Sequence, residues 1–277
     1  MYENWNKKSF STNQRLLAEF IQRNEQRVLY LTEQEMADEL GISIASVSRF
    51  WKAVGFVNAK QFKARLRFRL ETSPAIKLQE TMNLVKELSL PEMLLNSCLH
   101  HLEETSKRLS PELLKEASAM IQQARQVYVY SPGPCISLAE LFAFRLRRFG
   151  IGIQLMAASG HELLETLMHA GEKDVILVFG FVHLLPEIEV IMDHAREAHY
   201  RIILITDRFI YPRLDHADLV LYAGRGEVWE FHSMIAPMYV IENLILHIGM
   251  SLPEHHVDKL THLQQMRVTY ASKLPRQ

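Results

Sequence analysis

Residues 31–56, LTEQEMADELGISIASVSRFWKAVGF, contain two short amphipathic helical patterns that meet at Gly41. Thr32, followed three residues later by Glu35, forms a capping box and predicts the start of the first helix. Gly41 can end that helix because glycine adopts a positive φ without strain. Ser43 then caps the second helix. Two helices joined by a short turn centred on glycine have the spacing of a helix-turn-helix.

The second helix has one apolar face and one small or basic face. Ile44, Val47 and Trp51 are expected to point inward. Small hydroxylated side chains near the helix N-terminus can approach bases or phosphates, and arginine can donate two hydrogen bonds to guanine. We therefore expect these residues to bind DNA: Thr32, Ser43, Ala45, Ser46, Ser48, Arg49, Lys52 and Lys60.

Charge is distributed unevenly along the chain. Residues 40–70 contain seven basic residues and no acidic one. The net charge of −1 combines +4 for residues 1–75 with −5 for residues 76–277. Attraction to phosphates explains such a segment, although a solvated face of an ordinary helical hairpin is the alternative. Arg49 and Lys52 could equally contact phosphates instead of bases, since most protein–DNA hydrogen bonds go to the DNA backbone.

After residue 110 the pattern changes to short apolar runs that alternate with helical stretches. This alternation is typical of buried parallel strands with helical crossovers. The expected strands are Val127–Tyr130, Ile151–Leu155, Val175–Phe179, Ile202–Ile205 and Leu219–Tyr222. We predict a multidomain fold: an all-α helix-turn-helix head at 1–75, a helical linker at 76–109, and a three-layer α/β domain at 110–277 with a five-stranded, mainly parallel sheet.

The cellular compartment is predicted from cysteines and apolar segments. Cys98 and Cys135 are the only cysteines, which suits a reducing cytoplasm. The N-terminus lacks the apolar stretch of a signal peptide. Residues 234–252 are apolar but include Glu242 and His247, so we expect a buried helix and no membrane partner.

The chain resembles the RpiR family of bacterial transcriptional regulators, which join a helix-turn-helix domain to a sugar isomerase (SIS) domain. In the head, the resemblance lies in residues 37–56, including the Arg-Phe pair at 49–50 and Lys52. In the second part, the family pattern GxGxSxxxAxxxxxKLxxxG maps onto residues 131–150, and the later Thr206-Asp207 and HADLVL at 216–221 also match. The resemblance implies a regulator whose SIS domain binds a carbohydrate derivative.

Departures from the family pattern lie where a phosphosugar would bind. The resemblance implies a Ser-x-Ser-Gly-x-Thr loop that holds the phosphate, but residues 179–184 read FGFVHL, and Val182 replaces its glycine. In the first loop Ser131 replaces a glycine and Cys135 replaces a serine. Each lost hydroxyl donor removes a bond of roughly 1 to 3 kcal/mol to a charged group. We expect a changed ligand or none.

The remaining polar groups define a candidate effector site: Ser131, Gly133, Cys135, His183 and Glu230. Gly133 opens a turn whose free N–H groups could receive an anion. His183 could meet that anion as an imidazolium, or be an ordinary surface histidine. Without a phosphate clamp to position a substrate we expect no catalysis, hence no enzyme. We expect no cofactor and no metal, since His255 and His256 point about 100° apart on a helix.

Together these features predict a cytoplasmic DNA-binding regulator that senses a small metabolite other than a standard phosphosugar. Its partners are double-stranded operator DNA, a possible small-molecule effector, and further copies of itself as a homodimer or higher oligomer on a palindromic site. Two alternatives remain open: an SIS-type sugar-phosphate isomerase, and a regulator whose SIS domain is only a dimerisation scaffold.

Overall fold

A computed structural model describes residues 5, 10–71, 74–85, 89–157, 159–182, 184–208, 214–226 and 230–274. The chain divides into two compact units, one built mainly from residues 1–83 and the other mainly from residues 84–277. No single helix in the described ranges is long and apolar enough to cross a membrane. The pair α12 (Ile235–Ser251) and α13 (Pro253–Thr269), bent by 101° at their junction, is long and apolar enough only when the two are taken together.

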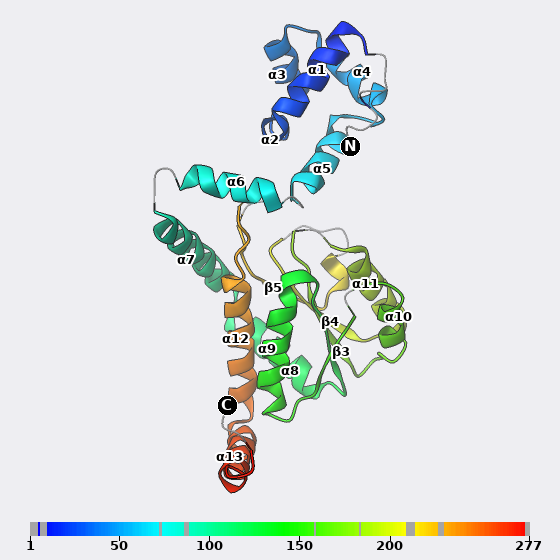
Figure 1. Cartoon of the computed structure of the whole chain (residues 1–277). Coiled ribbons are helices and arrows are strands. Elements are labelled where there is room, and N and C mark those ends of the chain that lie inside the picture. Colours follow the sequence, from blue (N-terminus) through cyan, green and yellow to red (C-terminus); the bar gives the residue numbers. More distant parts are fainter. Residues whose placement is uncertain are drawn as a thin grey trace. The chain divides into compact units, whose positions relative to one another are not determined.

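All the regular elements that the structure describes in the first unit are helices (Figure 1). Its helices are α1 (Thr12–Arg23), α2 (Glu25–Val28), α3 (Glu33–Leu40), α4 (Ile44–Ala53), α5 (Ala59–Glu71) and α6 (Pro74–Leu84). Aromatic rings fill its core: Trp5, Phe50, Trp51 and Phe62 lie at most 3% exposed. The ring centroids of Trp51 and Phe62 are 4.8 Å apart, which fixes α4 against α5. Burial of these large rings is the main favourable term holding this small unit together.

One expectation for α4 was wrong. Ile44 is 46% exposed, and the buried face of the helix consists of Val47, Phe50 and Trp51. These three residues repeat at i, i+3, i+4, the spacing of one face of an α-helix. Ile44 lies a turn too early, at the first position of the helix, where its side chain projects beyond the core.

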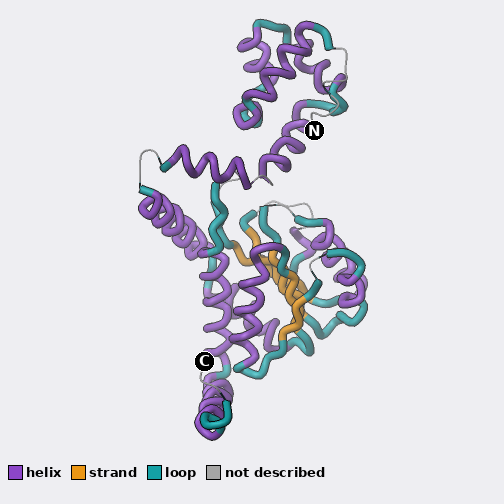
Figure 2. The backbone as a smooth tube through the Cα atoms, viewed as in Figure 1, coloured by secondary structure: helices purple, strands orange, loops and turns teal. Residues whose placement is uncertain are grey.

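The second unit is built around a sheet of five parallel strands in the order β2-β1-β3-β4-β5 (Figure 2). The strands are β1 (Val127–Tyr130), β2 (Ile153–Leu155), β3 (Val175–Phe179), β4 (Arg201–Thr206) and β5 (Leu219–Tyr222). β1 and β3 are buried along their whole length, as central parallel strands with both faces covered should be. The expected five-stranded parallel sheet is confirmed.

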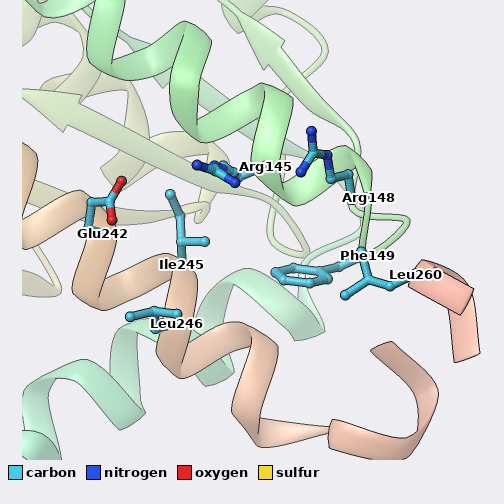
Figure 3. Close-up of a pocket in the computed structure, with 7 residues that line it drawn as sticks. All are labelled: Arg145, Arg148, Phe149, Glu242, Ile245, Leu246 and Leu260. Atoms are coloured by element: carbon cyan, nitrogen blue, oxygen red, sulfur yellow. The ribbon is translucent and has the colours of Figure 1, made fainter. Parts of the chain in front are cut away.

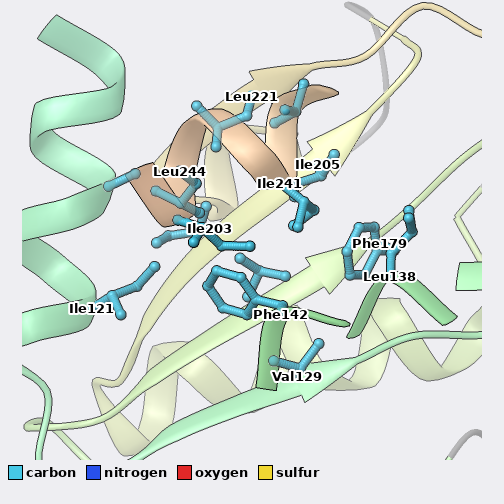
Figure 4. Packing of buried hydrophobic residues seen from close by; sticks show 14 of the residues in the cluster. Ile121, Val129, Leu138, Phe142, Phe179, Ile203, Ile205, Leu221, Ile241 and Leu244 are labelled. Atoms are coloured by element: carbon cyan, nitrogen blue, oxygen red, sulfur yellow. The ribbon is translucent and has the colours of Figure 1, made fainter. Parts of the chain in front are cut away.

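Helices cover both faces of the sheet. Helices α8 (Pro111–Gln123), α9 (Ile136–Arg147) and α12 (Ile235–Ser251) bury one face, with Phe142, Ile203 and Leu244 at its centre (Figure 4). Helices α10 (Glu162–Leu167) and α11 (Pro186–Ala198) cover the other. Helix α7 (Leu90–Arg108), which lies in the range expected to be the linker, packs against α12, and α13 (Pro253–Thr269) follows α12. Two single turns of 3-10 helix, Gly133–Cys135 and Leu214–His216, complete the unit.

Candidate DNA interface and ligand site

Capping interactions fix the geometry of the helix-turn-helix. The Thr32 hydroxyl accepts from the Glu35 N–H at 3.1 Å, and the Glu35 carboxylate accepts from the Thr32 N–H at 2.6 Å. These bonds hold the pKa of Glu35 below its ordinary value. Gly41 ends α3 with φ +63°, the left-handed conformation that the turn requires. Trp51 donates its indole N–H to Glu33 at 2.8 Å, so the start of α3 is tied to α4.

The outward face of α4 has the composition expected of a recognition helix. Ala45, Ser48, Arg49 and Lys52 are all exposed. Ser43 caps the helix by accepting from the Ser46 N–H at 3.3 Å, and the two hydroxyl oxygens lie 2.9 Å apart. The N-terminus of α4 therefore presents two hydroxyls beside free backbone N–H groups, an arrangement suited to a phosphate oxygen.

Ile44 is a candidate contact residue that sequence reasoning missed. It was assigned to the core, but its side chain is 46% exposed at the start of α4, next to Ala45. Apolar side chains at this end of a recognition helix can contact the methyl group of thymine. The signal that could have identified it is the i, i+3, i+4 spacing of Val47, Phe50 and Trp51, which fills the inner face without it.

The basic residues of the head have different roles. Lys60, Arg65 and Arg67 are exposed along α5, while Thr32 is exposed at the start of α3. Lys63 is half-buried and donates to the Leu31 carbonyl oxygen, and burial lowers the pKa of its ammonium group. Lys63 thus connects α5 to the segment before α3, so its role is structural. The side chain of Arg69 lies outside the described residues.

In the second unit, the chain reverses its direction of travel across the sheet between β1 and β3. From β1 it passes outward to β2, and then returns past β1 to form β3. Ligands of parallel sheets bind beyond the carboxyl ends of the strands at such a switch point. The loops after β1 and β3 are therefore the place where a ligand site is expected, and they contain most of the candidate effector residues.

The loop after β1 presents its backbone to a ligand more than its polar side chains. Gly133 has φ +58° and lies at the exposed start of the 3-10 turn that leads into α9. Ser131 is 5% exposed and Cys135 is 3% exposed. Burial raises the pKa of the Cys135 thiol to about 11, so the sulfur is neutral at neutral pH. A neutral thiol is a much weaker partner for an anion than the serine hydroxyl of the family pattern.

The loop after β3 is held by a side chain from the neighbouring strand. The Asp207 carboxylate, one residue beyond β4, accepts a hydrogen bond from the Val182 N–H at 2.8 Å. Val182 keeps φ +65°, a conformation that a β-branched residue rarely adopts. Burial raises the pKa of Asp207, while the Val182 N–H and the charge of Arg225 oppose that rise. His183 lies outside the described residues, and Glu230 is half-buried in the connection between β5 and α12.

Arg225 is a second functional candidate that sequence reasoning missed. It follows β5 by three residues and is only 7% exposed. Its guanidinium carbon lies 4.6 Å from the centre of the Phe181 ring, so it reaches the loop after β3. Burial lowers its pKa, and the charge of Asp207 raises it. Its isolated position in the sequence, surrounded by Gly224 and Gly226, gave no periodic signal by which to find it.

Among the described residues, one group of histidines and a carboxylate brings possible metal ligands together. His256 donates from Nδ1 to the Gly249 carbonyl oxygen at 3.1 Å and packs on Phe149, so it is a structural residue. His100, His101 and Glu104 on α7 place ligand atoms within 4.8 Å of one another. Glu104 already pairs with Arg108 at 3.0 Å. Adjacent helical histidines also project in different directions, so this group is a poor ready-made site.

Comparisons with known proteins agree with this two-part description. The family model "Helix-turn-helix domain, rpiR family" matches residues 4–73. A protein of Clostridium perfringens described as an uncharacterized HTH-type transcriptional regulator is 21% identical over 254 residues, which cover 89% of this chain and 90% of that protein. The HTH-type transcriptional regulator HexR of Pseudomonas aeruginosa is 22% identical, covering 66% of this chain and 64% of that protein.

Solved structures show the same fold. The sugar isomerase domain of an RpiR transcription factor from Sphaerobacter thermophilus superposes with a TM-score of 0.59 at 23% identity, covering 64% of this chain and 98% of that domain. The NanR protein of Vibrio vulnificus, complexed with ManNAc-6P, superposes with a TM-score of 0.61 at 17% identity, covering 95% of this chain and 96% of that one.

Proposed function

We propose that this chain is an RpiR-type transcriptional regulator with a helix-turn-helix domain and an SIS domain, and that α4 reads a specific operator in the major groove. The observation that carries the proposal is the outward face of α4, where Arg49 and Lys52 are exposed beside Ala45 and Ser48. Arg49 has the length and the paired donors to recognise guanine, while Lys52 and Lys60 suit phosphates.

Selection from a random duplex library by the full chain tests this function. A regulator enriches one sequence, and its affinity for that sequence falls steeply as salt rises because bound cations are released from the DNA. The expected sequence is palindromic, with half-sites about one helical turn apart. Equal affinity for all sequences, or affinity independent of salt, would contradict the proposal.

We propose that the second unit forms a homodimer through α12 and its neighbours. Leu246 and Met250 on α12 are 60% and 75% exposed, and Phe144 on α9 is 52% exposed. Beside Leu246 lies a shallow cavity of about 300 Å³ whose rim contains Arg145, Arg148 and Glu242 (Figure 3). A twofold interface brings the same patch together with itself, so an apolar centre with both signs of charge around it is self-complementary. A second copy of this chain is therefore its proposed occupant.

We further propose that the second unit senses a small metabolite in the cytoplasm and catalyses no reaction. The NanR structure with ManNAc-6P supports a ligand for this fold. The loop after β3 contains Phe181 and Val182 where phosphosugar binding needs hydroxyls and glycine, which argues against an ordinary sugar phosphate. Turnover of any common sugar phosphate in an isomerase assay would overturn this part of the proposal.

Transmission to the head is proposed to pass through the helices between residues 74 and 111, the range that includes the proposed 76–109 linker. Helix α7 in this range packs against α12, and its Thr105 hydroxyl accepts from the Gly224 N–H at 2.9 Å. A change at the end of β5 can therefore reach α7 directly. Equal operator affinity with and without the true effector would exclude this route.

A further inference from the structure

We propose that Arg225 binds an anionic group, a carboxylate or a phosphate, of the small molecule that the second unit senses. The inference rests on the sensing role proposed above and names the chemistry of its ligand. Residues 179–184 lack the hydroxyl loop of the family pattern. A single buried positive charge would bind the anionic group in its place.

The side chain of Arg225 is buried. Only 7% of its surface is exposed, although the transfer of a cation away from water is costly unless it is paired and hydrogen-bonded. The Gly224 N–H donates to the Thr105 hydroxyl, so the backbone that carries Arg225 is anchored to α7. A charge held in such a place needs a compensating partner.

The hydrogen-bond donors of Arg225 are incompletely used. A guanidinium has five N–H donors in one plane. Within the described residues, the hydrogen bond recorded for this group runs from Nη2 to the His232 carbonyl oxygen at 3.5 Å, and Nε has no partner. Phe181 lies against a flat face of the guanidinium, so any further hydrogen bonds are made at its edge. Carboxylates and phosphates match that edge with two parallel hydrogen bonds.

The charge of Arg225 lies near the loops that follow β1 and β3. Arg225 lies three residues beyond β5, packs on Phe181 after β3, and is close enough to Cys135 after β1 to influence its pKa. It therefore points to the β1/β3 switch point, where ligands of parallel sheets bind. The charged group acting on Arg225 is Asp207, whose carboxylate already accepts the Val182 N–H. Asp207 is also under the charge of Arg208. An anion that accepts hydrogen bonds from Arg225 would supply further negative charge to this buried guanidinium.

Thermal unfolding of the full chain in different anions tests the proposal. Orthophosphate and acetate are compared with chloride at equal ionic strength at pH 7, for the parent, Arg225→Gln and Arg196→Gln. Arg196 is exposed on α11, so its variant removes the same charge elsewhere. An anion at ten times its Kd should raise the melting temperature of the parent and Arg196→Gln by about 3 °C, and that of Arg225→Gln by less than about 1 °C. Anions that bind the basic head shift the melting temperature of all three proteins equally, so their effect cancels in this comparison.

Comparison of the two anions shows whether the ligand carries a phosphate or a carboxylate. A shift with phosphate alone identifies a phosphorylated ligand, and a shift with acetate identifies a carboxylate. The proposal is overturned if neither anion stabilises the parent beyond chloride, or if Arg225→Gln retains the full shift.

A direct signal keeps the test decisive if Arg225→Gln does not fold. The Nε–H resonance of Arg225 in ¹⁵N spectra of the parent, assigned by its loss in Arg225→Lys, should move on addition of the effective anion. A resonance that moves with neither anion overturns the proposal. Operator binding reports separately: Arg225→Gln should bind DNA within about twofold of the parent without anion, because α4 is untouched. If the parent binds no specific DNA, the regulator role is contradicted. The anion-dependent shifts in melting temperature still test the role of Arg225 independently.

Discussion

The Asp207 carboxylate accepts the backbone N–H of Val182 at 2.8 Å, and so ties the end of β4 to the loop that follows β3. In the family pattern this loop uses its own glycine and hydroxyls to surround a phosphate. Here a carboxylate of the protein meets one of the loop N–H groups, and Val182 retains φ +65° without the glycine that makes this conformation easy. The loop is thus held by a bond within the protein.

Val182→Gly should stabilise the protein by about 1 kcal/mol. The strain of a β-branched residue at positive φ, of order 1 to 3 kcal/mol, is removed, while the greater freedom of glycine in the unfolded chain costs about 0.5 to 1 kcal/mol. Chemical unfolding of the second unit measures the difference. Val190→Gly on α11 is the control, and it should destabilise because helical φ suits valine better than glycine. Destabilisation of both variants to the same extent would show that Val182 is not strained.

The fold could be predicted more completely than the site. Apolar runs such as Val175–Phe179 report burial directly, because a central parallel strand has no solvent-facing side. Likewise Thr32, Glu35 and Gly41 carry local signals for caps that depend only on neighbouring residues. Arg225 could not be found this way, since its partners Phe181 and Asp207 are 44 and 18 residues away in the chain. The assignment of Ile44 failed because three later residues fill the core without it.

The Cys135 thiol should resist labelling in the folded protein. Burial favours the neutral form and raises the pKa to about 11, so at pH 8 about one thiol in a thousand is ionised. The labelling rate should therefore rise about tenfold per pH unit between pH 8 and 10. Reaction with a disulfide reagent, comparing the parent with Cys135→Ser and Cys98→Ser, assigns the signal to each sulfur. Complete labelling of Cys135 within seconds at pH 8 in the folded protein would contradict its burial.

Leu246→Glu should convert the dimer into a monomer. A carboxylate placed at the centre of an apolar twofold contact meets its own copy, and two buried like charges without partners cost several kcal/mol. Analytical ultracentrifugation of the full chain measures the mass. Val190→Glu places the same charge on α11, at a side chain that is 41% exposed, and should leave the dimer intact. A parent that sediments as a monomer, or a Leu246→Glu variant with unchanged mass, would rule out this surface.

Operator recognition by α4 is tested most directly by the affinity of three variants for the DNA that the full chain selects. Arg49→Ala and Lys52→Ala should weaken binding by about 1 to 3 kcal/mol and leave the melting temperature unchanged, because both side chains are exposed. Arg15→Ala, which removes an exposed charge from α1, is the matched control. Fluorescence anisotropy should show a loss for the α4 variants about tenfold or more beyond that of Arg15→Ala. Equal affinity of all three variants and the parent would contradict the assignment of α4 as the recognition helix.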